Sequence, residues 1–278
     1  MECAKNSKTY NYKVKMMEGL YIAASGGTKQ LKKLDAISNN IANINTQGFK
    51  RNLLVYEERT TPFQRIPLTG SDMTNLNSIQ VSDSAVSYVQ VTQSLTDFAQ
   101  GPFIKTDNPL DVAIEGKGFF VVNTPTGIRY TKNGNFHLDG LGQLVDQKGN
   151  MIMTRNEEPI LIPFGTKRVT IDQEGSVFGG IELDQDPLGQ LKIVSFNNLQ
   201  ALTKEGQGFY KISDSSVKEI LVNDAKVLQG FTENSNANVI HEMTQMIETL
   251  RQLEAYQKII QSIDEADDQS VNNLGRVA

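Results

Sequence analysis

The chain has 278 residues, 38% of them hydrophobic, and 32 acidic against 27 basic side chains give it a formal net charge of -5. A single core rarely grows beyond about 250 to 300 residues, so this length predicts two or three modules. The scattered Lys and Arg residues disfavour a nucleic-acid partner, and no apolar run approaches the roughly 18 residues of a membrane span.

Residues 1–16 form a basic leader without the apolar centre of a secretory signal. They include Cys3, the single cysteine, which excludes a disulfide framework within one chain. Met16 and Met17 directly precede the first periodic residues. We expect 1–16 to be a disordered leader or extension.

A long amphipathic helix is predicted from about Met17 to Asn45, inside a terminal segment that spans 17–50. Its apolar residues recur at gaps of three and four and therefore share one helical stripe. The stripe consists of Leu31, Leu34, Ile37, Ile41 and Ile44. Because one helix cannot bury this stripe against itself, the pattern predicts a partner surface.

Ser25, Gly26 and Gly27 weaken that helix, since each glycine costs roughly 1 kcal/mol relative to alanine. Two interpretations follow. Either another helix approaches closely where side chains are absent, or the helix kinks or breaks into two.

Asparagines crowd the end of the helix, and Gly48 and Phe49 follow in the turn TQGFK. Asparagine competes for backbone hydrogen bonds and glycine is common just past a helix, so termination is one interpretation. In the other, Asn40 and Asn43 set the register of a helix–helix seam as buried polar residues do in coiled coils.

The middle of the chain changes character twice. Residues 51–107 lose the helical period and are predicted to be an extended linker, and 108–213 show short strands separated by turns, typical of an antiparallel β domain. Glycines at Gly149 and Gly175 occupy turn positions that tolerate positive φ. Residues 214–236 are predicted to be a returning linker.

A second long helix is predicted over 237–273, with Asn236 as its candidate N-cap. Its stripe has the same gaps as the first and consists of Val239, Met243, Met246, Leu250, Leu253, Tyr256, Ile260 and Ile263. The two helices are therefore expected to pair as a coiled-coil-like rod domain, with the β domain inserted between them: an α+β fold.

The sequence offers little for catalysis. Neither His137 nor His241 lies in a recognisable catalytic motif, and GxSxG, HExxH and CxxC motifs are missing from the sequence. Gly116-Lys117-Gly118 leads into a strand pattern and is typical of a turn. We expect no catalytic, cofactor-binding or metal-binding residues and no small-molecule substrate.

Three stretches resemble one family. LDAISNNIANINTQGFKR at 34–51 resembles the N-terminal signature of the bacterial flagellar axial proteins, the rod and hook proteins. NPLDVAIEGKGFFVV at 108–122 resembles their β domain, and SNANVIHEMTQMIETLRQLEAYQKII at 235–260 their C-terminal helix. Arg251 to Glu254 and Ser195 to Ser213 are closer to the proximal rod subgroup, with the distal rod subgroup next.

The resemblance implies a structural rod subunit that leaves the cell through the flagellar type III export apparatus without a cleaved signal and polymerises in the periplasm with copies of itself and neighbouring rod proteins. The expected assembly interface consists of Leu31, Leu34, Ile37, Asn40, Ile41, Asn43, Ile44, Gly48, Phe49, Met243, Met246, Leu250, Leu253, Tyr256, Ile260 and Ile263. The alternatives are a hook-type protein of the same family, a secreted β-domain binding module or adhesin on a helical stalk, and a hydrolase.

This interpretation predicts that replacing Leu34 and Ile41 together by Asp abolishes rod assembly and motility, because charges enter the stripe, while the middle domain still folds. A swimming assay and circular dichroism of the purified variant measure the two outcomes. Normal motility of the double variant would contradict the proposed seam.

Overall fold

The computed structural model describes residues 2–62, 85–180, 186–206, 208–214, 216–222 and 225–275. The chain divides into two compact units. The first, called here the helix unit, comprises Met1–Ser38, Leu54–Ser94 and Met243–Ala278, and the second, the β body, comprises Asn39–Leu53 and Leu95–Glu242. Among the described residues, two α-helices accompany mainly antiparallel strands, which confirms the predicted α+β class.

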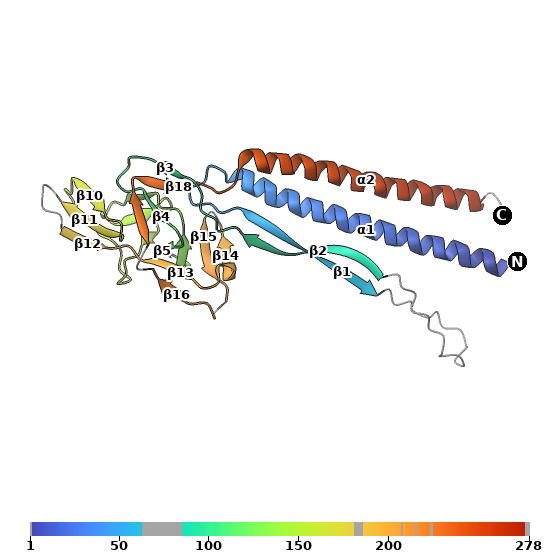
Figure 1. Cartoon of the computed structure of the whole chain (residues 1–278), viewed down its shortest axis with the longest axis horizontal. Coiled ribbons are helices and arrows are strands. Elements are labelled where there is room, and N and C mark those ends of the chain that lie inside the picture. The colour runs from blue at the N-terminus through green and yellow to red at the C-terminus, as the bar shows by residue number, and fades with distance from the viewer. Residues whose placement is uncertain are drawn as a thin grey trace. The chain divides into compact units, whose positions relative to one another are not determined.

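The helices are α1 (Glu2–Ala42) and α2 (Val239–Gly275). α1 begins upstream of Met17 and runs without interruption through Ser25, Gly26 and Gly27, so the break considered for this point is not observed. Figure 1 shows the two helices side by side within the helix unit. A Cβ atom on Gly26 would lie 2.4 Å from Cε1 of Tyr256, so here the absent side chain permits the close approach of another helix.

Strands β1 (Asn52–Pro62) and β2 (Ala85–Thr96) form a two-stranded sheet in the segment predicted to be an extended linker. Residues 63–84 of that predicted linker lie outside the described residues. Within the helix unit, Nζ of Lys29 on α1 lies 4.5 Å from the ring centroid of Tyr56 on β1, a cation–π contact.

The largest sheet of the β body has nine strands. Its main path runs in the order β14-β15-β6-β5-β9-β8-β7, and β13 pairs with both β5 and β16. The strands are β5 (Phe119–Thr124), β6 (Gly127–Thr131), β7 (Phe136–Leu138), β8 (Leu144–Asp146), β9 (Met151–Ile152), β13 (Ile193–Phe196), β14 (Leu202–Glu205), β15 (Phe209–Ile212) and β16 (Glu219–Leu221).

Smaller sheets complete the β body. They are the three-stranded sheet β10 (Arg168–Ile171), β11 (Ser176–Gly180) and β12 (Asp186–Gln190), and the pairs β4 (Val112–Glu115) with β17 (Lys226–Gln229) and β3 (Phe103–Lys105) with β18 (Phe231–Glu233). A short 3-10 helix, Leu199–Ala201, follows Asn198, whose side chain accepts a hydrogen bond from the Gln200 amide.

The returning segment 214–236 differs from the predicted linker because it supplies β16, β17 and β18. These strands pair with β13, β4 and β3, which lie far away in the sequence. Val227 of β17 is opposite Ile114 of β4, and both side chains are buried. The returning segment is thus part of the β body.

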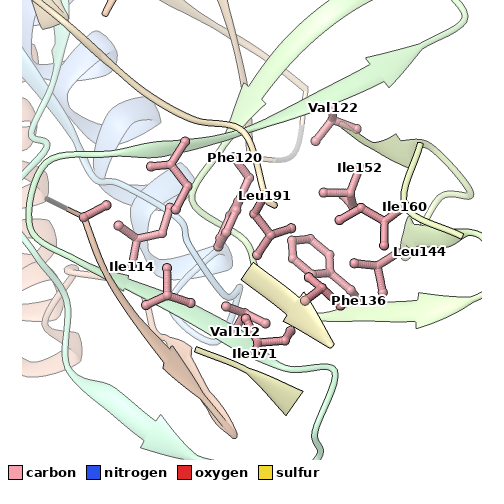
Figure 2. Close-up of a cluster of buried hydrophobic side chains, with 14 of the residues drawn as sticks. Val112, Ile114, Phe120, Val122, Phe136, Leu144, Ile152, Ile160, Ile171 and Leu191 are labelled. Carbon is pink, nitrogen blue, oxygen red and sulfur yellow. The ribbon is translucent and has the colours of Figure 1, made fainter. Parts of the chain in front are cut away.

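Strand β5 is the centre of the core because both of its faces are buried. Phe120 and Val122 belong to one apolar cluster, which Figure 2 shows, and Phe119 and Val121 belong to another. Alternate side chains of a strand point to opposite faces. The continuous apolar run of β5 therefore fits a strand covered on both sides.

Two predicted turns have the expected geometry. Oδ1 of Asp146 accepts hydrogen bonds from the amides of Lys148 and Asn150, and Gly149 has φ +81°. Asp172 and Gly175, with φ +82°, repeat the arrangement. Positive φ is nearly free of strain for glycine, so these residues turn the chain tightly between strands.

We predict that Phe136→Ala lowers the free energy of unfolding by about 3–5 kcal/mol, since the side chain is 1% exposed and the change leaves a cavity. The control is Phe164→Ala, where the side chain is 81% exposed, with an expected change within about 0.5 kcal/mol. Because the chain lacks tryptophan, urea unfolding is followed by circular dichroism. Equal effects of the two variants would contradict the assigned core.

Candidate assembly surface

The asparagine-rich end of α1 turns the chain by local hydrogen bonds. Nδ2 of Asn43 donates to the carbonyl of Asn39 over 2.9 Å, and Oγ1 of Thr46 donates to Oδ1 of Asn43. Gly48 follows with φ +69°. Asn43 thus closes its own turn, whereas the sequence also suggested a role for it in a helix–helix seam.

Asn40 acts over a longer range and is 3% exposed. Its Oδ1 accepts a hydrogen bond from the amide of Asn52, and its Nδ2 donates to the Asn52 carbonyl and, over 3.3 Å, to Oε2 of Glu242. Glu242 is on the first turn of α2. Asn40 therefore ties the end of α1 to the first residue of β1 and to the start of α2.

Gly48 and Phe49 hold the turn TQGFK at 46–50, called here the signature turn, against the rest of the β body. The Gly48 amide donates to the carbonyl of Glu233 over 2.7 Å. A Cβ atom on Gly48 would lie 2.4 Å from the backbone nitrogen of Asn133, so any side chain there would collide with backbone. Phe49 is buried beneath Lys204, whose Nζ is 3.8 Å from the ring centroid.

Lys50 carries a charge into the interior. Its side chain and that of Glu233 are both 0% exposed, and Nζ lies 2.5 Å from Oε1 of Glu233. Nζ also donates to the Ala99 carbonyl, and Oε1 also accepts a hydrogen bond from the Gly101 amide. The pair therefore joins the signature turn, the 97–101 loop and β18.

Further buried polar groups surround this ion pair. Nζ of Lys132 lies 3.9 Å from Oε2 of Glu233 and donates to the Gly116 carbonyl. Burial, together with the nearby charge of Lys50, lowers the pKa of Lys132 to about 8, while Glu233 opposes the shift. Burial also raises the pKa of Tyr210, and the charge of Glu233 adds to that shift.

A second lysine fixes the chain beyond the turn. Nζ of Lys204, on β14, donates to the carbonyl of Lys50 over 2.6 Å and to Oδ1 of Asn52 over 2.9 Å. Burial lowers the pKa of this lysine to about 8. Other segments of the β body thus hold the backbone from residue 48 to residue 52 on several sides.

The prediction that Asn236 caps α2 is wrong. Oδ1 of Asn238 accepts the hydrogen bond from the His241 amide, so Asn238 is the cap of a helix that begins at Val239. Asn236 instead accepts a hydrogen bond from the Arg51 amide and donates to the carbonyls of Asp97 and Ala99. Asn236 therefore connects Arg51 with the 97–101 loop, and it lies two residues upstream of the capping position.

The exposure of the predicted interface residues in the N-terminal segment 17–50 separates them into groups. Ile37, Asn40, Gly48 and Phe49 are buried, Leu31 is 50% exposed, and Leu34, Ile41, Asn43 and Ile44 are partly buried. The buried stripe continues upstream through small residues, Ala23, Gly26 and Gly27, and through Gln30. Sequence patterns built on large apolar residues miss these positions.

On α2 the predicted stripe divides into two faces. Met246, Leu253, Tyr256, Ile260 and Ile263 are partly buried. Met243 and Leu250 are 50% and 41% exposed, and Ile247, which the sequence analysis did not select, is 55% exposed. At roughly 100° per residue, Met243, Ile247 and Leu250 share one exposed stripe beside the partly buried face.

Neither α1 nor α2, over the residues described, contains a stretch both long and apolar enough to cross a bilayer. Within the same residues, His, Cys, Asp and Glu side chains form no group of three or more that could hold a metal ion.

Comparison with known families gives three matches. The flagella basal body rod protein family matches residues 20–50, the flagellar hook protein FlgE/F/G D1 domain matches 113–179, and the flagellar basal body rod FlgEFG protein C-terminal family matches 228–274. The matches include parts of both helices and of the β body.

Individual relatives extend over nearly the whole chain. The flagellar basal-body rod protein FlgG of Buchnera aphidicola subsp. Schizaphis graminum is 34% identical over 260 residues, which cover 90% of this chain and 97% of the relative. FlgG of Bacillus subtilis is 33% identical, over 92% of this chain and 99% of the relative. The flagellar basal-body rod protein FlgF of Caulobacter vibrioides is 32% identical, over 94% and 100%.

We predict that Lys50→Met destabilises the β body by about 3–5 kcal/mol, because it leaves the Glu233 carboxylate buried without its cation. The double variant Lys50→Met/Glu233→Gln is expected to recover much of this loss, since Gln removes the charge and keeps an acceptor for Gly101. Urea unfolding of the full chain measures both.

The matched control is Lys105→Met. Lys105 pairs with Asp107 over 2.8 Å, but the two side chains are 65% and 76% exposed. An exposed pair contributes at most about 1 kcal/mol. A loss for Lys50→Met no larger than for the control would contradict the role of the buried pair.

Proposed function

This chain belongs to the flagellar basal-body rod protein family, and from this premise we propose that it polymerises through its terminal helices into the rod that acts as the drive shaft of the flagellum. Its role is that of a structural subunit, not of an enzyme. The partners in this proposal are copies of itself and neighbouring rod proteins.

The observation that carries the proposal is the exposed stripe Met243, Ile247 and Leu250 on α2. Each side chain is 41% exposed or more in the isolated chain. Fully burying a side chain of this size contributes roughly 1.5 to 3 kcal/mol. A helix that places three of them in water on one face is well suited to a neighbouring subunit.

A second part of the proposal is a coiled-coil-like pairing of α1 and α2. Tyr256 packs against Gly26, and Ile263 Cδ1 would lie 3.7 Å from a Cβ atom on Gly19. The small residues of α1 thus face the large residues of α2. In the pairing that we propose, the partly buried residues of both helices form the seam within one subunit, and the exposed stripe contacts a neighbour.

The subgroup, the route of export and the location are also proposed. Arg251 to Glu254 and Ser195 to Ser213 favour a proximal rod protein of the FlgF type, with a distal FlgG-type protein as the alternative. We propose export through the flagellar type III apparatus without a cleaved signal and assembly in the periplasm. Support comes from the relatives named FlgF and FlgG.

The alternative of a secreted binding module on a helical stalk is less well supported. The family matches cover parts of α1, α2 and the β body, and the relatives align over nine tenths of this chain. A binding module with an unrelated stalk would share the β body alone.

We predict that Ile247→Asp combined with Leu250→Asp abolishes rod assembly and motility while the purified monomer keeps its fold, because both side chains are exposed in the free chain. Complementation in a swimming assay and isolation of basal bodies measure assembly, and circular dichroism measures the fold.

Ile259→Asp is the control, since Ile259 is 47% exposed on α2 but lies on the opposite side from the stripe. The control should swim. Normal motility of the double variant, or equal loss in the control, would show that this stripe is not the assembly surface.

A further inference from the structure

A groove of about 680 Å³ lies within the β body, at the place where the chain leaves the signature turn and enters α2. Three segments line it: Ile44, Asn45 and Arg51 after α1, the loop 97–102, and residues 234–240. Its volume falls within the roughly 300–1,000 Å³ of protein pockets that hold ligands. No residue role that we predicted from the sequence accounts for this groove.

The charges of the groove neutralise each other. Nε of Arg51 donates to Oδ2 of Asp97 over 2.8 Å, and the two side chains are 28% and 22% exposed. The Asn236 amide bridges the Arg51 amide and the carbonyls of Asp97 and Ala99. A phosphate or a metal ion would find its opposite charge already paired, which favours an uncharged occupant.

The rim of the groove is apolar and exposed. Ile240 is 78% exposed and Val239 is 41% exposed, and both lie on the first turn of α2. Ile44 and Pro102 add apolar surface on the other segments. Ile240 lies three residues before Met243, at the spacing that places both on one side of the helix. Ile240, on the rim of the groove, therefore lies on the same side of α2 as the exposed stripe proposed for assembly.

We propose that this groove receives apolar side chains from a terminal helix of a second copy of the chain. The inference rests on the proposed function and adds a second contact to it. A polymer that grows without closing joins two different surfaces of its subunits, and the groove and an exposed helix face are two such surfaces. The neutral lining and the apolar rim suit the apolar side chains that α1 and α2 leave exposed.

The test uses the full chain in the native bacterium, with a photoreactive benzoylphenylalanine placed at Ile240. The same group at Ile247 probes the exposed stripe, and at Phe164, which is 81% exposed on the β body, it measures the background. All three side chains are exposed, so the substitution leaves the core intact. Cross-linked products are identified by mass spectrometry of peptides from isolated basal bodies.

Irradiation is expected to link position 240 to a second copy of the chain, with a yield well above that at position 164. Cross-links from 247 to a second copy, together with none from 240 or with links from 240 to a different protein only, would overturn the groove proposal and leave the proposed function intact. If neither 240 nor 247 is linked to a second copy or to another rod protein, both proposals fail.

Discussion

The buried contact between Lys50 and Glu233 is the constraint on which the arrangement of the β body depends. An ion pair without solvent exposure is tolerated only where the geometry is good and the remaining hydrogen-bonding atoms find partners. The carbonyl of Ala99 and the amide of Gly101 supply two such partners, whereas Oε2 of Glu233 makes no hydrogen bond among the described residues and lies 3.9 Å from Nζ of Lys132. The signature turn, the loop before β3 and strand β18 must therefore assemble together.

This requirement explains why the positions around Lys50 accept few other side chains. Gly48 has no room for a side chain against the backbone of Asn133, and Phe49 lies between the turn and Lys204. Asn40 then fixes the chain on the other side of the turn and reaches Glu242 on α2. Buried polar groups thus connect the C-terminal end of α1 with the N-terminal end of α2, and both of these ends belong to the β body.

Local sequence patterns predicted what depends on near neighbours. The two helices, the β class, the run of β5 and the turns at Gly149 and Gly175 each follow from the identity of a few adjacent residues. The turns are predictable because an aspartate side chain accepts amide hydrogens within its own turn, and glycine tolerates the positive φ that follows.

Sequence patterns failed where distant residues decide the outcome. β16, β17 and β18 are three or four residues long and show no clear period, and they become strands because β13, β4 and β3 offer partners. Nothing near Lys50 indicates that its partner is 183 residues away. By position, Asn236 and Asn238 could each be the N-cap of α2. The contact with Arg51, which is distant in the sequence, gives Asn236 a different role.

The two neighbouring apolar faces of α2 have a mechanical consequence. A helix with one such face can pair with a single partner. A helix with two faces about a quarter turn apart can be shared by two partners and can form part of a continuous wall. In such a wall, torque applied to one subunit is carried as shear between interlocked side chains on both sides, and no single contact bears the whole load.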